Sequence, residues 1–127
     1  MIQIPVSIGE LIDKLSILQI KKNKITNPEK LVQVKKEFEL LYNQSAEYLN
    51  DMQIENLYHE LVQVNTYLWD IEDRLRVLEL EGRFEGEFIE IARKVYITND
   101  KRFELKNQIN LLTDSGIREV KDYVKYQ

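Results

Sequence analysis

The sequence predicts an all-α protein. Only four glycines and two prolines occur in 127 residues, so few positions would interrupt a helix. Apolar residues make up 43% of the chain and charged residues 31%, which is typical of a globular chain rather than a disordered or membrane-embedded one. The longest segments repeat apolar residues at heptad spacing, which favours a four-helix bundle or a coiled-coil-like assembly. At this length we expect a single helical domain over residues 1–127.

Residues 1–7 are expected to form a short extended arm before the first helix. Apolar side chains alternate at Ile2, Ile4 and Val6. Pro5 lacks an amide proton, so such a segment is restricted to an edge position.

The first two helices are bounded by capping signals. Ser7 and Glu10 have the spacing of a capping box, in which the serine hydroxyl accepts from the Glu10 amide and the glutamate reaches back to the Ser7 amide. Asn27 followed by Pro28 is typical of an N-cap and a first helical position. These signals predict a shorter helical hairpin, with helices over residues 8–24 and 28–49.

The next two predicted helices carry matching heptad seams, and Gly82 and Gly86 bracket the turn between them. The helix over residues 54–81 repeats Leu57, Leu61, Val64, Leu68, Ile71, Leu75 and Leu78. The helix over residues 84–113 repeats Phe84, Phe88, Ile91, Val95, Thr98, Arg102, Leu105, Ile109 and Leu112. Pairing these seams about Arg83 predicts a long antiparallel hairpin. Thr98 or Asn99 offers an alternative cap, so continuity over 97–100 stays open, and residues 114–127 are expected to form a loose or docked tail.

Two positions on the second seam, Thr98 and Arg102, are polar where apolar residues are expected. A cation on a seam needs a partner, because an unpaired buried charge is costly, and Asp70 and Asp73 are the candidates on the facing helix. The arrangement indicates either a polar ligand pocket or a structural ion pair that fixes helix register. The candidate pocket residues are Asn65, Trp69, Asp70, Asp73, Tyr96, Thr98, Asn99, Asp100 and Arg102.

An enzyme is the less favoured alternative. The chain has no cysteine and one histidine, which excludes disulfides, thiolate zinc sites and multi-histidine metal sites. Paired carboxylates three residues apart can bind Mg²⁺ together with substrate phosphates, as in all-α nucleotide pyrophosphohydrolases. A metal-dependent nucleotide or phosphate hydrolase would use Asp70, Asp73, Glu87 and Glu90. Without such a site we expect no cofactor.

Charge is unevenly distributed along the chain. Residues 14–36 carry seven lysines and one glutamate, whereas residues 47–90 carry twelve acids and three arginines. The formal net charge is −4 and no aromatics interleave with the lysines, so nucleic-acid binding is disfavoured. The favoured interpretation is a basic helix face that pairs with the acidic segment, within the chain or across a dimer.

A long hairpin covered by two shorter helices should leave apolar surface exposed, so we expect a homodimer. The expected function is a non-enzymatic helical interaction or oligomerisation module, with a further protein partner as a second possibility. No signal peptide or apolar membrane span is evident, so a cytoplasmic location and no membrane partner are expected.

Three blocks in order carry a family resemblance: residues 5–18 (PVSIGELIDKLSIL), 68–73 (LWDIED) and 95–102 (VYITNDKR). With them the chain resembles a family of small bacterial and phage helical proteins of unknown function. The resemblance implies no activity, cofactor or catalytic residue. Some relatives occur beside glycosyltransferase-like proteins, which implies a link to surface-polysaccharide synthesis. The tail over residues 119–123 departs somewhat from the ending typical of that family.

Overall fold

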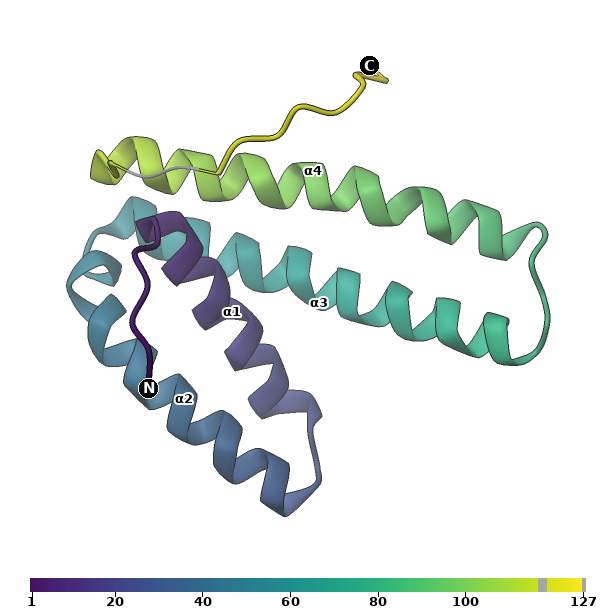
Figure 1. The fold of residues 1–127 in the computed structure, drawn as a ribbon, viewed down its shortest axis with the longest axis horizontal. Coiled ribbons are helices and arrows are strands. Elements are labelled where there is room, and N and C mark those ends of the chain that lie inside the picture. The colour runs from purple at the N-terminus through teal and green to yellow at the C-terminus, as the bar shows by residue number, and fades with distance from the viewer. Residues whose placement is uncertain (117–118, 127) are drawn as a thin grey trace.

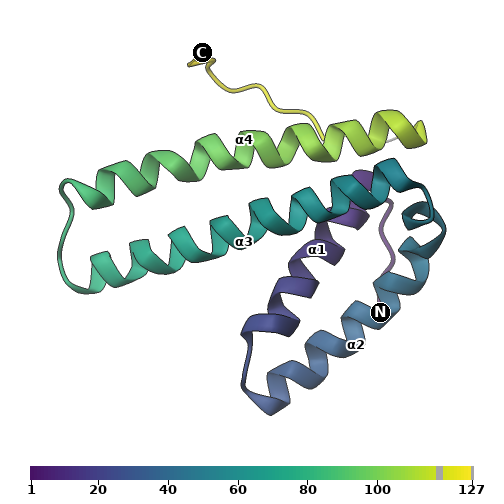
Figure 2. The ribbon, with the colours of Figure 1, turned by 180° about the vertical axis from the view of Figure 1, so that it is seen from behind.

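The protein consists of four helices that pack on one another, as a computed structural model shows for residues 1–116 and 119–126 (Figure 1). The helices are α1 (Ile8–Lys24), α2 (Pro28–Leu49), α3 (Met52–Leu80) and α4 (Glu87–Thr113), and the described residues contain no strand. The all-α class is therefore confirmed. The helices form two hairpins, a long one from α3 and α4 and a shorter one from α1 and α2 (Figures 1 and 2).

Helices α1 and α2 begin at the expected capping residues. The Ser7 hydroxyl accepts a hydrogen bond from the Glu10 amide at 3.1 Å, and the Asn27 side chain accepts one from the Lys30 amide at 3.1 Å. The second half of the expected capping box is replaced by another contact, because the Glu10 carboxylate lies 2.7 Å from Nζ of Lys106 on α4. The first turn of α1 is thereby tied to a distant helix.

Helices α3 and α4 differ slightly from the predicted 54–81 and 84–113. Helix α3 begins two residues earlier because Asp51 caps it, accepting from the Gln53 amide at 2.8 Å. Helix α4 begins three residues later because the turn includes Gly82 at φ 68° and Gly86 at φ 57°, a left-handed region that glycine enters without steric cost. It then runs without interruption through residues 97–100 to Thr113, so no new helix is capped at Thr98 or Asn99.

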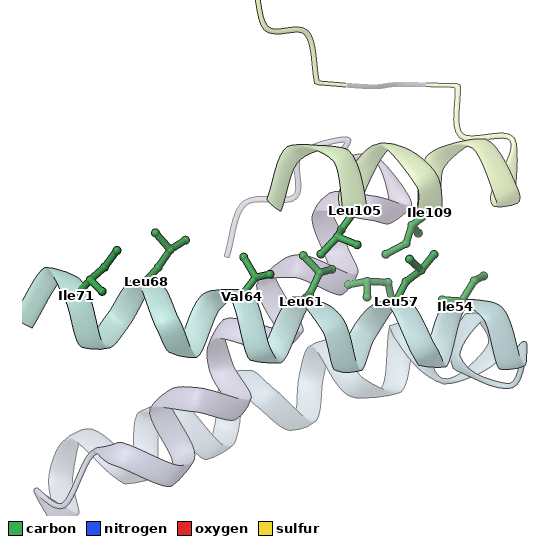
Figure 3. Packing of buried hydrophobic residues seen from close by; sticks show 9 residues of the cluster. Ile54, Leu57, Leu61, Val64, Leu68, Ile71, Leu105 and Ile109 are labelled. Carbon is green, nitrogen blue, oxygen red and sulfur yellow. The ribbon is translucent and has the colours of Figure 1, made fainter. Parts of the chain in front are cut away.

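The core lies along the seam between α3 and α4 and is completed by α1. Figure 3 shows Leu105 of α4 over Leu61 of α3 and Ile109 over Leu57, which is the register expected from pairing about Arg83. Ile12 of α1 belongs to the same buried cluster. Helix α1 contacts all three other helices, which explains why apolar residues occur on several of its sides.

The predicted seam fails at both of its ends. Phe84 lies in the turn before α4 and is 50% exposed, where it packs edge-on against Phe88. Leu112 is 48% exposed at the far end of α4. The seam is buried only where another helix or the facing seam covers it.

The shorter hairpin covers only part of the longer one. Helices α1 and α2 lie against the half of the α3–α4 hairpin that holds the start of α3 and the end of α4, while the half nearest the Gly82–Gly86 turn projects beyond them (Figures 1 and 2). We call this projecting half, residues 70–97, the distal arm. None of the described helices combines the length and apolarity that crossing a membrane requires.

Candidate functional site

A polar cluster forms where α1, α3 and α4 meet, and we call its four members, Asp13, Ser16, Asn65 and Arg102, the Asp13 cluster. Arg102 binds both carboxylate oxygens of Asp13, with Nε 2.9 Å from Oδ1 and Nη2 2.6 Å from Oδ2. Asn65 donates from Nδ2 to Asp13 Oδ1 at 3.0 Å and to Ser16 Oγ at 2.8 Å. The Ser16 hydroxyl donates to the Asp13 carbonyl oxygen at 2.6 Å. One side chain of α3 and one of α4 therefore converge on a single carboxylate of α1.

The cluster is buried, and its hydrogen bonds are satisfied. The Asp13 side chain is 1% exposed and that of Arg102 is 28% exposed. In the part of the chain that the structure describes, every buried side-chain nitrogen or oxygen has a hydrogen-bond partner. The bond to Asp13 raises the pKa of Arg102 above its usual value, which outweighs the opposing effect of burial. The paired fork geometry is the strongest form of arginine–carboxylate contact.

A second set of contacts ties the start of α1 to α4 beside the Asp13 cluster. Asn110 Oδ1 accepts a hydrogen bond from the Gly9 amide at 2.7 Å. Nζ of Lys106 lies 2.7 Å from Glu10 and 2.8 Å from Glu119. Burial lowers the pKa of Lys106, but the hydrogen bonds that its ammonium group donates to the two glutamates outweigh this effect, so the pKa is raised overall.

These contacts follow the helical repeat on both helices. Asp13 and Ser16 follow Gly9 by four and seven residues on α1, and Lys106 and Asn110 follow Arg102 by four and eight on α4. Each set therefore lies on one helix face. The geometry is that of an ion pair that joins α1 to α4, and Asp13 and Arg102 also line a hollow of about 230 Å³ together with Lys14 and Glu37.

The partner predicted for Arg102 is wrong. The guanidinium binds Asp13 of α1, whereas Asp70 pairs with Lys24 at 2.7 Å and Asp73 is exposed. The seam pairs only α3 with α4. The structure adds α1 at this point, and its buried carboxylate lies nearer to the guanidinium than either acid of α3.

The other predicted pocket residues are spread over several places, although Asn99 lines one hollow together with Arg102. Thr98 lines a separate surface hollow together with Val64 and Tyr67. Trp69 is half-buried on α3. Tyr96, Asn99 and Asp100 contact the C-terminal segment: the Tyr96 ring meets that of Tyr126, the Asn99 carbonyl accepts from Lys121, and the Asp100 carboxylate accepts from Tyr126. Of the nine candidates, only Asn65 and Arg102 join the Asp13 cluster.

The four carboxylates predicted to bind Mg²⁺ are not brought together. Glu87 is held by Arg74 through two hydrogen bonds of 2.8 Å, and this contact lowers the pKa of Glu87. Asp70 is paired with Lys24 near the base of the distal arm. Among residues 1–116 and 119–126, no three histidine, cysteine or acidic side chains are grouped as a metal site requires. The donor set therefore does not fit a magnesium centre.

Sequence comparison places the chain in a known group. It matches the group described as "Family of unknown function (DUF6165)" over residues 2–126. The chain belongs to this family. The expected membership of a family of unknown function is thus confirmed, and the match includes the residues of the Asp13 cluster. Neither the curated proteins nor the solved structures contain a match to the chain.

Proposed function

We propose that the protein is a helical interaction module that associates with a second copy of itself through its two diverging hairpins. The observation that carries this proposal is the charge on their free ends. The α1–α2 hairpin includes residues 14–36, with seven lysines and one glutamate. The first part of the distal arm, residues 70–90, holds eight acids and three arginines. One chain therefore offers both members of a complementary pair of surfaces.

The two surfaces meet only at their base within one chain. Lys24, at the end of α1, lies 2.7 Å from Asp70, at the start of the distal arm. Beyond this point the distal arm extends away from α1 and α2 (Figures 1 and 2). The acids of the distal arm and the lysines of the α1–α2 hairpin that form no ion pair among the described residues are left to attract another chain, namely Glu72, Asp73, Glu79 and Glu85 on the distal arm and Lys21, Lys22, Lys30, Lys35 and Lys36 on the hairpin.

Exposed apolar side chains on the same hairpins supply the apolar area that an interface between two chains would bury. On the distal arm they include Leu80 at 88% and Ile89 at 54% exposed, and on α2 they include Val32 at 62%. Apolar area removed from water stabilises an interface by about 25 cal/mol per Å². Charge gives such a contact its orientation and speed of encounter, while apolar burial provides much of the affinity.

A second copy suits these surfaces because, in a twofold-symmetric dimer, the basic surface of each chain can pair with the acidic surface of the other. In an isologous dimer, the basic hairpin of each chain lies against the acidic distal arm of the other. A partner of a different sequence would need to match one surface and leave the other uncovered. Since the resemblance includes relatives beside glycosyltransferase-like proteins, we propose surface-polysaccharide synthesis as the setting in which the assembly works.

Charge-reversal variants test the proposal by sedimentation velocity. Lys35→Glu with Lys36→Glu changes the basic hairpin, and Glu72→Lys with Glu79→Lys changes one side of α3 in the distal arm. We expect each double variant to weaken self-association by about tenfold or more, because like charges then face each other across the interface. An equimolar mixture of the two should associate as the unmodified chain does.

The control for the acidic double variant is Glu55→Lys with Glu60→Lys, which makes the same charge change at the opposite end of α3, where both acids are exposed. It should associate like the unmodified chain. If both test variants also behave like the unmodified chain, or if mixing them restores nothing, the proposed interface is wrong.

A further inference from the structure

The C-terminal residues 119–126, which we call the strap, run back over the outer side of α4 (Figures 1 and 2). Three side chains of the strap tie it to the helix. Glu119 lies 2.8 Å from Nζ of Lys106, and the Tyr126 hydroxyl donates to Asp100 at 2.9 Å. Lys121 lies 3.5 Å from the Asn99 carbonyl oxygen.

These contacts hold the strap only weakly. It contains no helix or strand, and its apolar residues Val120 and Val124 are 86% and 93% exposed. Ordering a chain segment also costs conformational entropy, which its few contacts must offset. Glu119 differs from the other strap residues because the Lys106 side chain that it binds is only 8% exposed, so an anion that displaces Glu119 must take over its contact with this ammonium group.

Three basic side chains line the hollow beneath the strap. This hollow has a volume of about 260 Å³, and Arg102, Lys106 and Lys121 line it together with Phe103 and with two carboxylates, Glu10 and Glu119. Arg102 uses Nε and Nη2 to bind Asp13, and its Nη1 has no hydrogen-bond partner among the described residues. A guanidinium edge with free N–H groups is suited to a planar or tetrahedral oxyanion.

Glu119 contributes a carboxylate to this hollow from the strap. Its Oε2 is hydrogen-bonded to Lys106, whose ammonium is otherwise bound only by Glu10 among the described residues. If the Glu119 side chain swings outward, Lys106 loses one of its two carboxylates and the hollow loses one negative charge. The vacated position lies between the ammonium group and the strap.

We propose that this hollow binds a small molecule through a carboxylate or phosphate group, and that Glu119 competes with the ligand for the same cations. The anionic group takes the place of the Glu119 carboxylate on Lys106 and extends toward the free edge of Arg102. Lys121 covers it from the strap, and the Phe103 ring, 5.4 Å from the Lys121 ammonium, offers an apolar face to the rest of the ligand. The site is independent of the surfaces proposed for self-association.

Titration calorimetry with inorganic phosphate and with succinate tests this site in the full chain. Glu119→Gln weakens the internal competitor while keeping its shape, so at least one of the two anions should bind about fivefold or more tightly than to the unmodified chain. Glu104→Gln is the control, because it removes the same charge from an exposed position on α4. It should leave the affinity unchanged. Adding Lys121→Gln to Glu119→Gln should then weaken binding by about threefold or more, because it removes a cation of the hollow.

The outcomes distinguish a phosphate ligand from a carboxylate ligand, and a specific site from a general effect of charge. Tighter binding of phosphate alone indicates a phosphorylated ligand, and tighter binding of succinate alone indicates a carboxylic acid. Equal affinities in Glu119→Gln and Glu104→Gln would show that only general charge matters and would overturn the proposal. Failure of both anions to bind Glu119→Gln would overturn it as well.

Discussion

Replacing Asp13 with alanine should lower the free energy of unfolding by about 3 kcal/mol, near the lower end of the cost of breaking a buried ion pair. The substitution leaves the Arg102 guanidinium without its two hydrogen bonds and removes one acceptor from Asn65. The Arg102 side chain is 28% exposed, so water can solvate part of the orphaned charge, which is why we expect the lower value. Urea denaturation followed by circular dichroism measures the change.

Asp70→Ala is the matched control for that experiment. Asp70 is also an aspartate paired with a cation of another helix, at 2.7 Å from Lys24, but its side chain is 56% exposed. Surface pairs of this kind contribute about 0–1 kcal/mol. Similar losses in Asp13→Ala and Asp70→Ala would show that the Asp13 cluster does not hold α1 in place.

Gly9→Ala should also destabilise the protein, by about 1–3 kcal/mol, the range for overpacked sites. A Cβ atom on Gly9 would lie well inside van der Waals contact of the Lys106 carbonyl oxygen and 2.8 Å from Oδ1 of Asn110. Alanine in an open helix position would instead stabilise by up to about 1 kcal/mol. The sign of the change therefore reports how closely α1 approaches α4, and thermal or urea unfolding measures it.

Gly116→Ala is the comparison for Gly9→Ala. A Cβ atom there would meet nothing within 4 Å, so the change should stay within about 0.5 kcal/mol. A stabilising effect of Gly9→Ala would contradict the close contact between the two helices. It would show that the first turn of α1 lies further from α4 than the structure places it.

The starts of α1 and α2 could be predicted from the sequence because a capping residue acts on backbone groups only two or three residues away. Ser7, Asn27 and Pro28 mark helix starts through their own chemistry, and the structure places helices where they indicate. The start of α4 could not be fixed in this way. Phe84 continues the heptad spacing, but the left-handed conformations of Gly82 and Gly86 keep it in the turn.

The candidate site could be predicted only in part. The sequence predicts Arg102 at a polar position of the seam and Asn65 among the polar residues near it, and both are members of the Asp13 cluster. Their partner was missed because heptad spacing pairs α3 with α4 and does not indicate where α1 crosses them. A signal was nevertheless present, since Asp13 shares a face of α1 with Ile17 and Ile20, four and seven residues further on.

Heptad spacing does not predict the contacts around Lys106 either. Lys106 and Asn110 share a helix face with Arg102, which a search for polar residues four apart would have found. Their partners, Gly9 and Glu10 on α1 and Glu119 on the strap, depend on tertiary packing. Glycine in particular carries no side chain that could indicate its role in a close contact.

The molar mass of the unmodified chain in solution tests the proposed self-association most directly. Size-exclusion chromatography with light scattering should show a mass that rises with concentration from 15.2 kDa to twice that value, and the dimer should weaken as salt screens the opposite charges. A mass of 15.2 kDa at every concentration and at low salt would contradict the proposal that two copies join through their diverging hairpins.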